Sequence, residues 1–98
     1  MELHINDILT RVSRYNLIRE GRMFYIDVHE KIQGNLAADF IAVPNLVNII
    51  ASTELQGAGE SEKAALENCL GKIKGMNILD IFPQASGGQG NQAPEADQ

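Results

Sequence analysis

Apolar and polar residues alternate from Arg22 to Ile32, and this period of two constrains the fold more than any other feature of the sequence. Successive side chains of an extended chain point to opposite faces, so one face is apolar and the other is mostly polar. The apolar set is Phe24, Ile26, Val28 and Ile32, and the other set is Tyr25, Asp27, His29 and Lys31. We therefore expect a β-strand with one buried face.

A second strand is expected to return along the first. Gln33-Gly34-Asn35 is typical of a tight turn, and Leu36–Val43 follows it until Pro44 stops the pairing. A loop of these three residues pairs Ile32 with Leu36, Val28 with Phe40 and Ile26 with Ala42 on the apolar face. It pairs His29 with Asp39 and Tyr25 with Val43 on the second face. The register set by the turn thus pairs apolar residues with apolar residues on one face. Because a slip of one residue would move every side chain to the other face, this agreement between turn and pattern supports the hairpin.

Two helices are expected to flank the strands. Roughly from Asn6 to Leu17, apolar residues recur at helical spacing, and Asn6 is suited to be an N-cap. The apolar residues are Ile5, Ile8, Leu9, Val12 and Tyr15. The second helix runs from Glu62 to Lys74, with Ser61 as N-cap and Gly75 as C-cap. Its expected buried stripe is Ala65, Leu66, Cys69, Leu70 and Ile73.

The remaining segments complete the predicted order. Thr53–Ala58 reads as a third strand, whereas Asn45–Ala51 fits a strand or a helical turn equally well. Met76–Phe82 is apolar enough to pack back on the body. Residues 84–98 contain no aromatic, β-branched, Leu or Met residue, so we expect a domain over 1–82 and a disordered tail over 83–98. The fold class is α+β: helix, three-stranded antiparallel sheet, helix (αβββα), with both helices on one face.

Charge and composition exclude several classes of function. The chain has 13 acidic and 8 basic residues, a formal charge of −5, which argues against a nucleic-acid partner. No apolar run approaches the roughly 20 residues that a bilayer requires, and the start resembles no signal peptide, so we expect a cytoplasmic protein with no membrane contact. The single cysteine, Cys69, excludes an internal disulfide, and its place in the helix stripe indicates an unreactive core residue.

The predicted element order resembles the double-stranded-RNA-binding-domain-like fold. Residues 57–65 (GAGESEKAA) are similar to the entry of that family's last helix. Those domains usually carry several lysines there to hold phosphates. Here Lys63 stands among Glu60, Glu62 and Glu67, so the resemblance implies the fold without the phosphate contacts.

Two other stretches resemble HicB-like antitoxin domains. Residues 40–46 (FIAVPNL) are similar to the family's strand and Pro-Asp-Leu turn, and Gly59-Glu60-Ser61 with residues 65–68 (ALEN) is similar to its helix entry. The resemblance implies a small acidic domain that covers a partner protein. The sequence departs from that family by a longer segment after Leu46, by its N-terminal helix and by having no DNA-binding module.

Three residues on the face expected to point outward form an apolar cluster: Tyr25, Ile41 and Val43. Such a cluster indicates either a contact surface or residues covered by Asn45–Ala51 or Met76–Phe82. No phosphate loop, nucleophile motif or metal-ligand spacing is present, so we expect no cofactor, no metal site and no catalytic residue. The sequence thus predicts a non-enzymatic interaction module that binds a partner protein or forms a homodimer through a sheet face.

Two other readings remain open. All four arginines, Arg11, Arg14, Arg19 and Arg22, lie close together, and the first two share a face of the predicted helix. Since a guanidinium matches phosphate well, the alternative function is RNA binding by this basic patch. Asp27, His29 and Asp39 converge on the outer face, where they form either a solvated charge pair or a metal or acid–base site.

Overall fold

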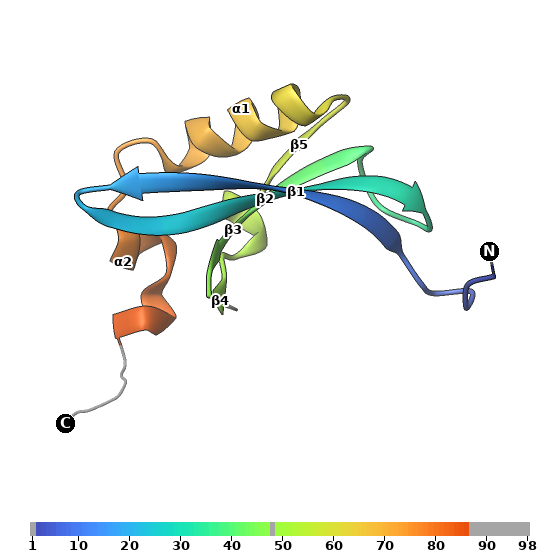
Figure 1. The fold of residues 1–98 in the computed structure, drawn as a ribbon, viewed down its shortest axis with the longest axis horizontal. Coiled ribbons are helices and arrows are strands. Elements are labelled where there is room, and N and C mark those ends of the chain that lie inside the picture. Colours follow the sequence, from blue (N-terminus) through green and yellow to red (C-terminus); the bar gives the residue numbers. More distant parts are fainter. Residues whose placement is uncertain (1, 48, 87–98) are drawn as a thin grey trace.

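The chain forms an antiparallel sheet with one main helix across it, an α+β architecture (Figure 1). The computed structural model describes residues 2–47 and 49–86. The strands are β1 (Leu9–Arg19), β2 (Arg22–Gln33), β3 (Phe40–Leu46), β4 (Ile49–Ile50) and β5 (Gly57–Gly59). The helices are α1 (Glu62–Ile73) and α2 (Ile78–Ile81), with 3-10 turns at Thr53–Leu55 and Pro83–Ser86. β1, β2 and β3 are neighbours in this order, and both β4 and β5 pair with β3.

The predicted N-terminal helix is wrong, because Leu9–Arg19 is an extended strand that pairs with β2 along its length. The apolar residues of this segment satisfy a helical spacing, but its β-branched and aromatic content also suits a strand. A two-residue loop after this segment turns the chain back, so that residues 9–19 pair with β2 as a strand. Glu20 and Gly21 both have positive φ, 54° and 78°, the geometry of a tight hairpin whose twist matches that of the strands.

The predicted hairpin of β2 and β3 is confirmed, but its register differs by two residues. Val28 lies opposite Ala42, and His29 lies opposite Ile41 rather than Asp39. β2 ends at Gln33 and β3 begins only at Phe40, so the connecting loop spans residues 34–39 instead of three residues. A shift of two leaves each side chain on its predicted face, which is why the apolar face was assigned correctly.

The predicted third strand is only partly present. Thr53–Leu55 is a 3-10 turn, and only Gly57–Gly59 pairs with β3. The ambiguous stretch 45–51 contains the end of β3 and the short β4, and Val47, which follows β3, has φ 43°. The additional pairing of β3 therefore comes from two short strands.

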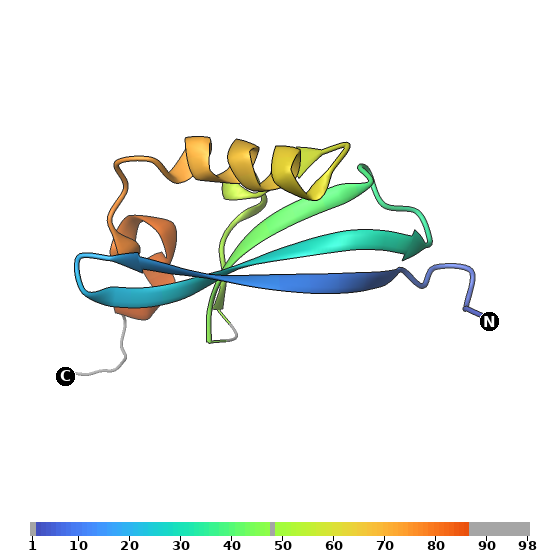
Figure 2. The same cartoon turned by 45° about the horizontal axis from the view of Figure 1, so that its top comes forward.

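The core lies between the sheet and the helices (Figure 2). We call the face of the sheet that α1 and α2 cover the closed face. Buried residues of the strands are Phe24, Ile26, Val28 and Ala42; those of the helical segments are Ala65, Cys69, Ile73, Ile78, Ile81 and Phe82. The rings of Phe24 and Phe82 meet edge to face at 5.4 Å. The prediction that 76–82 packs back on the body is thus confirmed.

The second predicted helix is confirmed with Ser61 as its N-cap, but it ends at Ile73 rather than Lys74, and its C-cap is Lys74 rather than Gly75. Ser61 Oγ accepts a hydrogen bond from the Ala64 amide at 3.0 Å, and Gly75 adopts φ 79° after the helix. Pro83–Ser86 forms a 3-10 turn whose Ala85 packs against the core, although the predicted tail included it. The rest of the predicted tail, residues 87–98, lies outside the described residues.

Candidate interaction surface

The sheet face opposite α1 and α2, the open face, carries the second set of side chains from β1, β2 and β3. The register aligns Val12 with His29 and Ile41, Arg14 with Asp27 and Val43, and Asn16 with Tyr25 and Asn45. Both helices bury their apolar residues with Phe24, Ile26 and Val28, which point to the closed face. The open face therefore has neither helix over it.

A hollow of about 350 Å³ lies at one end of the open face. It is lined by Ile8, Thr10, His29, Leu36, Ile41, Val43 and Gln56. Ile41 is half-buried and Val43 is 8% exposed, so these two predicted residues lie at the base of a depression rather than in a protruding patch. At its rim, Thr10 Oγ1 and His29 Nδ1 are 3.0 Å apart and share a hydrogen bond.

A polar cluster occupies the adjoining part of the open face. Arg14 donates two hydrogen bonds to Asp27, from Nε to Oδ1 at 2.7 Å and from Nη2 to Oδ2 at 2.9 Å. Asn45 Nδ2 donates a third to Asp27 Oδ2 at 3.0 Å. These donors, above all Arg14, hold the pKa of Asp27 below its usual value, although burial opposes the shift. The carboxylate is thus ionised at neutral pH, and each of its oxygens accepts at least one hydrogen bond.

Tyr25 belongs to this polar cluster rather than to the hollow. The Arg14 guanidinium carbon lies 4.2 Å from the centre of the Tyr25 ring, within cation–π range. The three predicted contact residues are therefore divided between two neighbouring parts of one face. The sequence pattern predicts the face and its apolar members, but it puts Arg14 in a basic patch of a helix rather than on this face, because its segment is predicted as helix.

The four arginines do not form the single patch expected of a helix. In a strand, Arg11 and Arg14 point to opposite faces. Arg11 binds Glu30 at 2.6 Å, and Arg14 binds Asp27. Arg19 donates to the carbonyls of Ile73 and Met76 at 2.9 and 2.5 Å, so it caps the carboxyl end of α1. Arg22 lies across the hairpin from Arg19.

Asp27, His29 and Asp39 are also not brought together. Asp39 Oδ1 lies 3.8 Å from Lys31 Nζ, and the expected pairing of His29 with Asp39 is wrong. Within 2–47 and 49–86, no group of three His, Cys, Asp or Glu side chains is placed to hold a metal ion.

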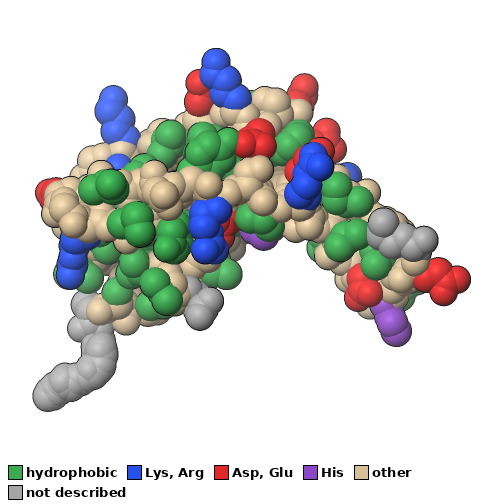
Figure 3. Space-filling view, viewed as in Figure 1, with side chains coloured by type: hydrophobic (Ala, Val, Ile, Leu, Met, Phe, Trp, Pro, Cys, Tyr) green, Lys and Arg blue, Asp and Glu red, His purple; other side chains and the backbone are tan. Residues whose placement is uncertain are grey.

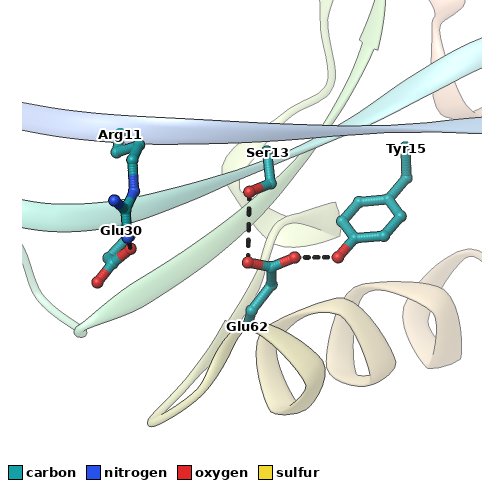
Figure 4. Close-up of polar contacts among 5 residues, drawn as sticks. All are labelled: Arg11, Ser13, Tyr15, Glu30 and Glu62. Carbon is teal, nitrogen blue, oxygen red and sulfur yellow. Dashed lines mark hydrogen bonds and ion pairs between the residues drawn. The ribbon is translucent and has the colours of Figure 1, made fainter.

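One acidic residue joins β1 to the main helix (Figure 4). Glu62, in the first turn of α1, accepts hydrogen bonds from Ser13 Oγ at 3.3 Å and from the Tyr15 hydroxyl. The bond to Glu62 raises the pKa of Tyr15, because it stabilises the protonated phenol. This contact links the first turn of α1 to β1, and no local sequence pattern indicates it.

Cys69 lies in the core as predicted. Its side chain is fully buried, and burial raises the pKa of its thiol to about 11. A thiol this basic holds its proton at neutral pH, so it is a poor nucleophile.

Comparison with known proteins finds no matching family model, no matching curated protein and no matching solved structure. The likenesses to double-stranded-RNA-binding-domain-like and HicB-like domains thus stay predictions, and the first of them assumed an N-terminal helix that is a strand here. Of the helices formed by the described residues, none is both long and apolar enough to cross a membrane.

Proposed function

We propose that this chain is a non-enzymatic interaction module that binds a partner protein, or a second copy of itself, through the open face. The observation that carries the proposal is that a hollow lined mainly by apolar side chains lies beside a hydrogen-bonded polar cluster. Protein interfaces commonly have an apolar centre and a polar border, and Tyr and Arg are enriched in them relative to the rest of the surface.

The hollow suits an apolar side chain of a partner. Its base is formed by Ile41 and Val43, and the hydroxyl of Thr10, the imidazole of His29 and the amide of Gln56 supply hydrogen-bonding groups at its border. An apolar anchor in such a depression gains affinity from the surface that both sides remove from water. The polar groups select the orientation of the partner.

The polar cluster supports binding rather than catalysis. Asp27 already accepts three hydrogen bonds, and its lowered pKa makes it a weak base. Arg14 is held by both Asp27 and the Tyr25 ring, so its side chain loses little freedom when a partner arrives. The cluster is therefore a preorganised element of a contact surface.

Site-specific photocrosslinking tests the proposal. A benzoylphenylalanine in place of Ile41 should give a covalent adduct with one defined protein, or with a second copy of the chain, in cells that express it. The matched position is Ile50 on β4, which is 56% exposed and lies outside the hollow. With the captured protein purified, Ile41→Asn should weaken its binding about tenfold or more, because the apolar base of the hollow is lost.

Equal crosslinking from the two positions would contradict the proposal. Recovery of RNA in place of protein would also contradict it, and would favour binding by the arginines. Circular dichroism of both Ile41 variants checks that the fold is retained.

A further inference from the structure

β1 is a long edge strand of the sheet (Figures 1 and 2). It has 11 residues and pairs with β2 on one side, and no other described element pairs with its second side. A free edge presents a row of backbone donors and acceptors that can pair with another strand. β1 contains no proline and no acidic residue, and the register irregularity lies only at its start, between Leu9 and Thr10.

The hairpin determines which backbone groups point to this free edge. In a two-residue hairpin, the flanking pair Arg19 and Arg22 is hydrogen-bonded, and hydrogen-bonded pairs alternate along the ladder. The backbone N–H and C=O groups of Arg11, Ser13, Tyr15 and Leu17 therefore point to β2. Those of Thr10, Val12, Arg14, Asn16 and Ile18 point away from it.

We propose that β1 pairs antiparallel with β1 of a second copy of this chain, about a two-fold axis at Ser13. This register places Leu9 opposite Leu17, Thr10 opposite Asn16, Arg11 opposite Tyr15, and Val12 opposite Arg14. The outward-pointing backbone pairs each exchange two hydrogen bonds. The result is one continuous sheet with the helices of both copies on the same side.

Repulsion between arginines disfavours two of the neighbouring registers, in which the two-fold axis passes through another residue. Centring the axis on Arg14 sets two arginines directly opposite each other, and centring it on Tyr15 sets Arg11 against Arg19. Like charges directly opposite destabilise a strand pair. Centring the axis on Val12 avoids this conflict but pairs only residues 9–15, whereas the axis at Ser13 pairs residues 9–17. The arginine spacing in β1 therefore favours Ser13.

The surroundings of β1 leave room for a second strand. Glu62 reaches β1 by hydrogen bonds, but α1 itself packs mainly over β5, β3 and β2. Arg11 and Arg14 are each paired with a carboxylate of β2, so the edge carries little uncompensated charge. The approach of an identical edge is therefore opposed neither by α1 nor by strong repulsion.

Apolar side chains along the hairpin are exposed in the single chain, as Figure 3 shows for the part near its turn. Val12 is 46% exposed and Ile18 is 72% exposed. Extending the register one step beyond the strand brings Ile18 of one copy beside Ile8 of the other, which is 48% exposed. Pairing would thus remove apolar surface from water on the same side as the hollow. The edge is a different surface from the base of the hollow, so this inference does not depend on the proposed function.

Cysteine crosslinking tests both the pairing and its register. Ser13→Cys should form a disulfide dimer under oxidised glutathione, because a non-hydrogen-bonded pair on the axis brings the two Cα atoms to about 4.5 Å. Arg11→Cys alone should not, since the two equivalent positions lie far apart across the axis. Mixing Arg11→Cys with Tyr15→Cys should again give a crosslinked dimer. Native Cys69 is fully buried and is common to all samples. Equal crosslinking of Ser13→Cys and Arg11→Cys would overturn the register.

Light scattering of the unmodified chain tests the association itself. The full chain should be a dimer, and Val12→Arg should raise its dissociation constant roughly tenfold, because it sets two arginine pairs opposite each other. Val12→Glu, a matched substitution at the same exposed position, should keep or strengthen the dimer through Arg14. Circular dichroism checks that both variants fold. A monomeric wild-type chain, or equal weakening by both variants, would overturn the proposal.

Discussion

On the closed face of the sheet, Phe24 and Val28 are each 1% exposed and lie among the apolar side chains of the helical segments. On the open face, Asp27 is almost as inaccessible, at 6%, but a guanidinium and an amide surround it. Alternate residues of the same strand are thus buried by different means. The closed face depends on volume and close packing, whereas the open face depends on satisfied polar groups and leaves a hollow beside them.

The largest expected loss of stability follows from removing a buried side chain of the closed face. Phe82→Ala removes a fully buried ring that meets Phe24 edge to face, and should lower the free energy of unfolding by about 3–5 kcal/mol. Leu79→Ala on α2, the short helix that ends just before Phe82, is the control, since Leu79 is 45% exposed and its truncation should cost under about 1 kcal/mol. Urea denaturation measures both. Similar losses for the two variants would remove the contrast between buried and exposed positions.

The next largest loss of stability is expected where the backbones of β5 and α1 approach each other closely. A Cβ at Gly57 would lie 2.4 Å from both the Ala65 carbonyl oxygen and the Cys69 nitrogen, so β5 or α1 must shift. Gly57→Ala should therefore cost about 2–3 kcal/mol. Gly71→Ala is the control within α1: a Cβ there meets nothing within 4 Å, and alanine should stabilise the helix by about 0.5–1 kcal/mol. A Gly57→Ala variant as stable as the wild type would contradict the close contact between Gly57 and α1.

The open face should give a smaller, pH-dependent effect. Asp27→Asn should cost about 1–2 kcal/mol at pH 7, because the bidentate bond to Arg14 is lost while the half-exposed guanidinium can still reach water. Since the folded-state pKa of Asp27 lies below its ordinary value of 3.8, the stabilisation is complete above that pH. It should disappear as the pH falls through the folded-state pKa.

Thermal denaturation between pH 2 and pH 7 measures this difference between wild type and variant. Glu30→Gln is the matched control, because its partner Arg11 is 73% exposed and such pairs contribute about 0.5 kcal/mol or less. If the difference in stability between wild type and Asp27→Asn stays the same in acid, the ion pair is not the cause of that difference.

The site was only partly accessible from the sequence. Ile41 and Val43 were placed on the correct face because the period of two survives a register error of two residues. Arg14, Gln56 and Thr10 were not assigned to that face, since their positions depend on a strand and a turn whose sequences fit other conformations. The bond between Glu62 and Tyr15 joins residues that are distant in sequence, and no local pattern indicates it.

By itself, the sequence determined the features whose causes are local: the alternation that makes β2 a half-buried strand, the serine and glycine that delimit α1, and the burial of Cys69 in its stripe. Only the tertiary structure decided that residues 9–19 form a strand, because their pattern suits both periods and the hydrogen bonds to β2 favour the extended one. The register of β3 against β2 likewise differs by two residues from the one that the sequence predicts. Partners of backbone groups in a sheet lie far along the chain, so their choice is settled by the whole fold.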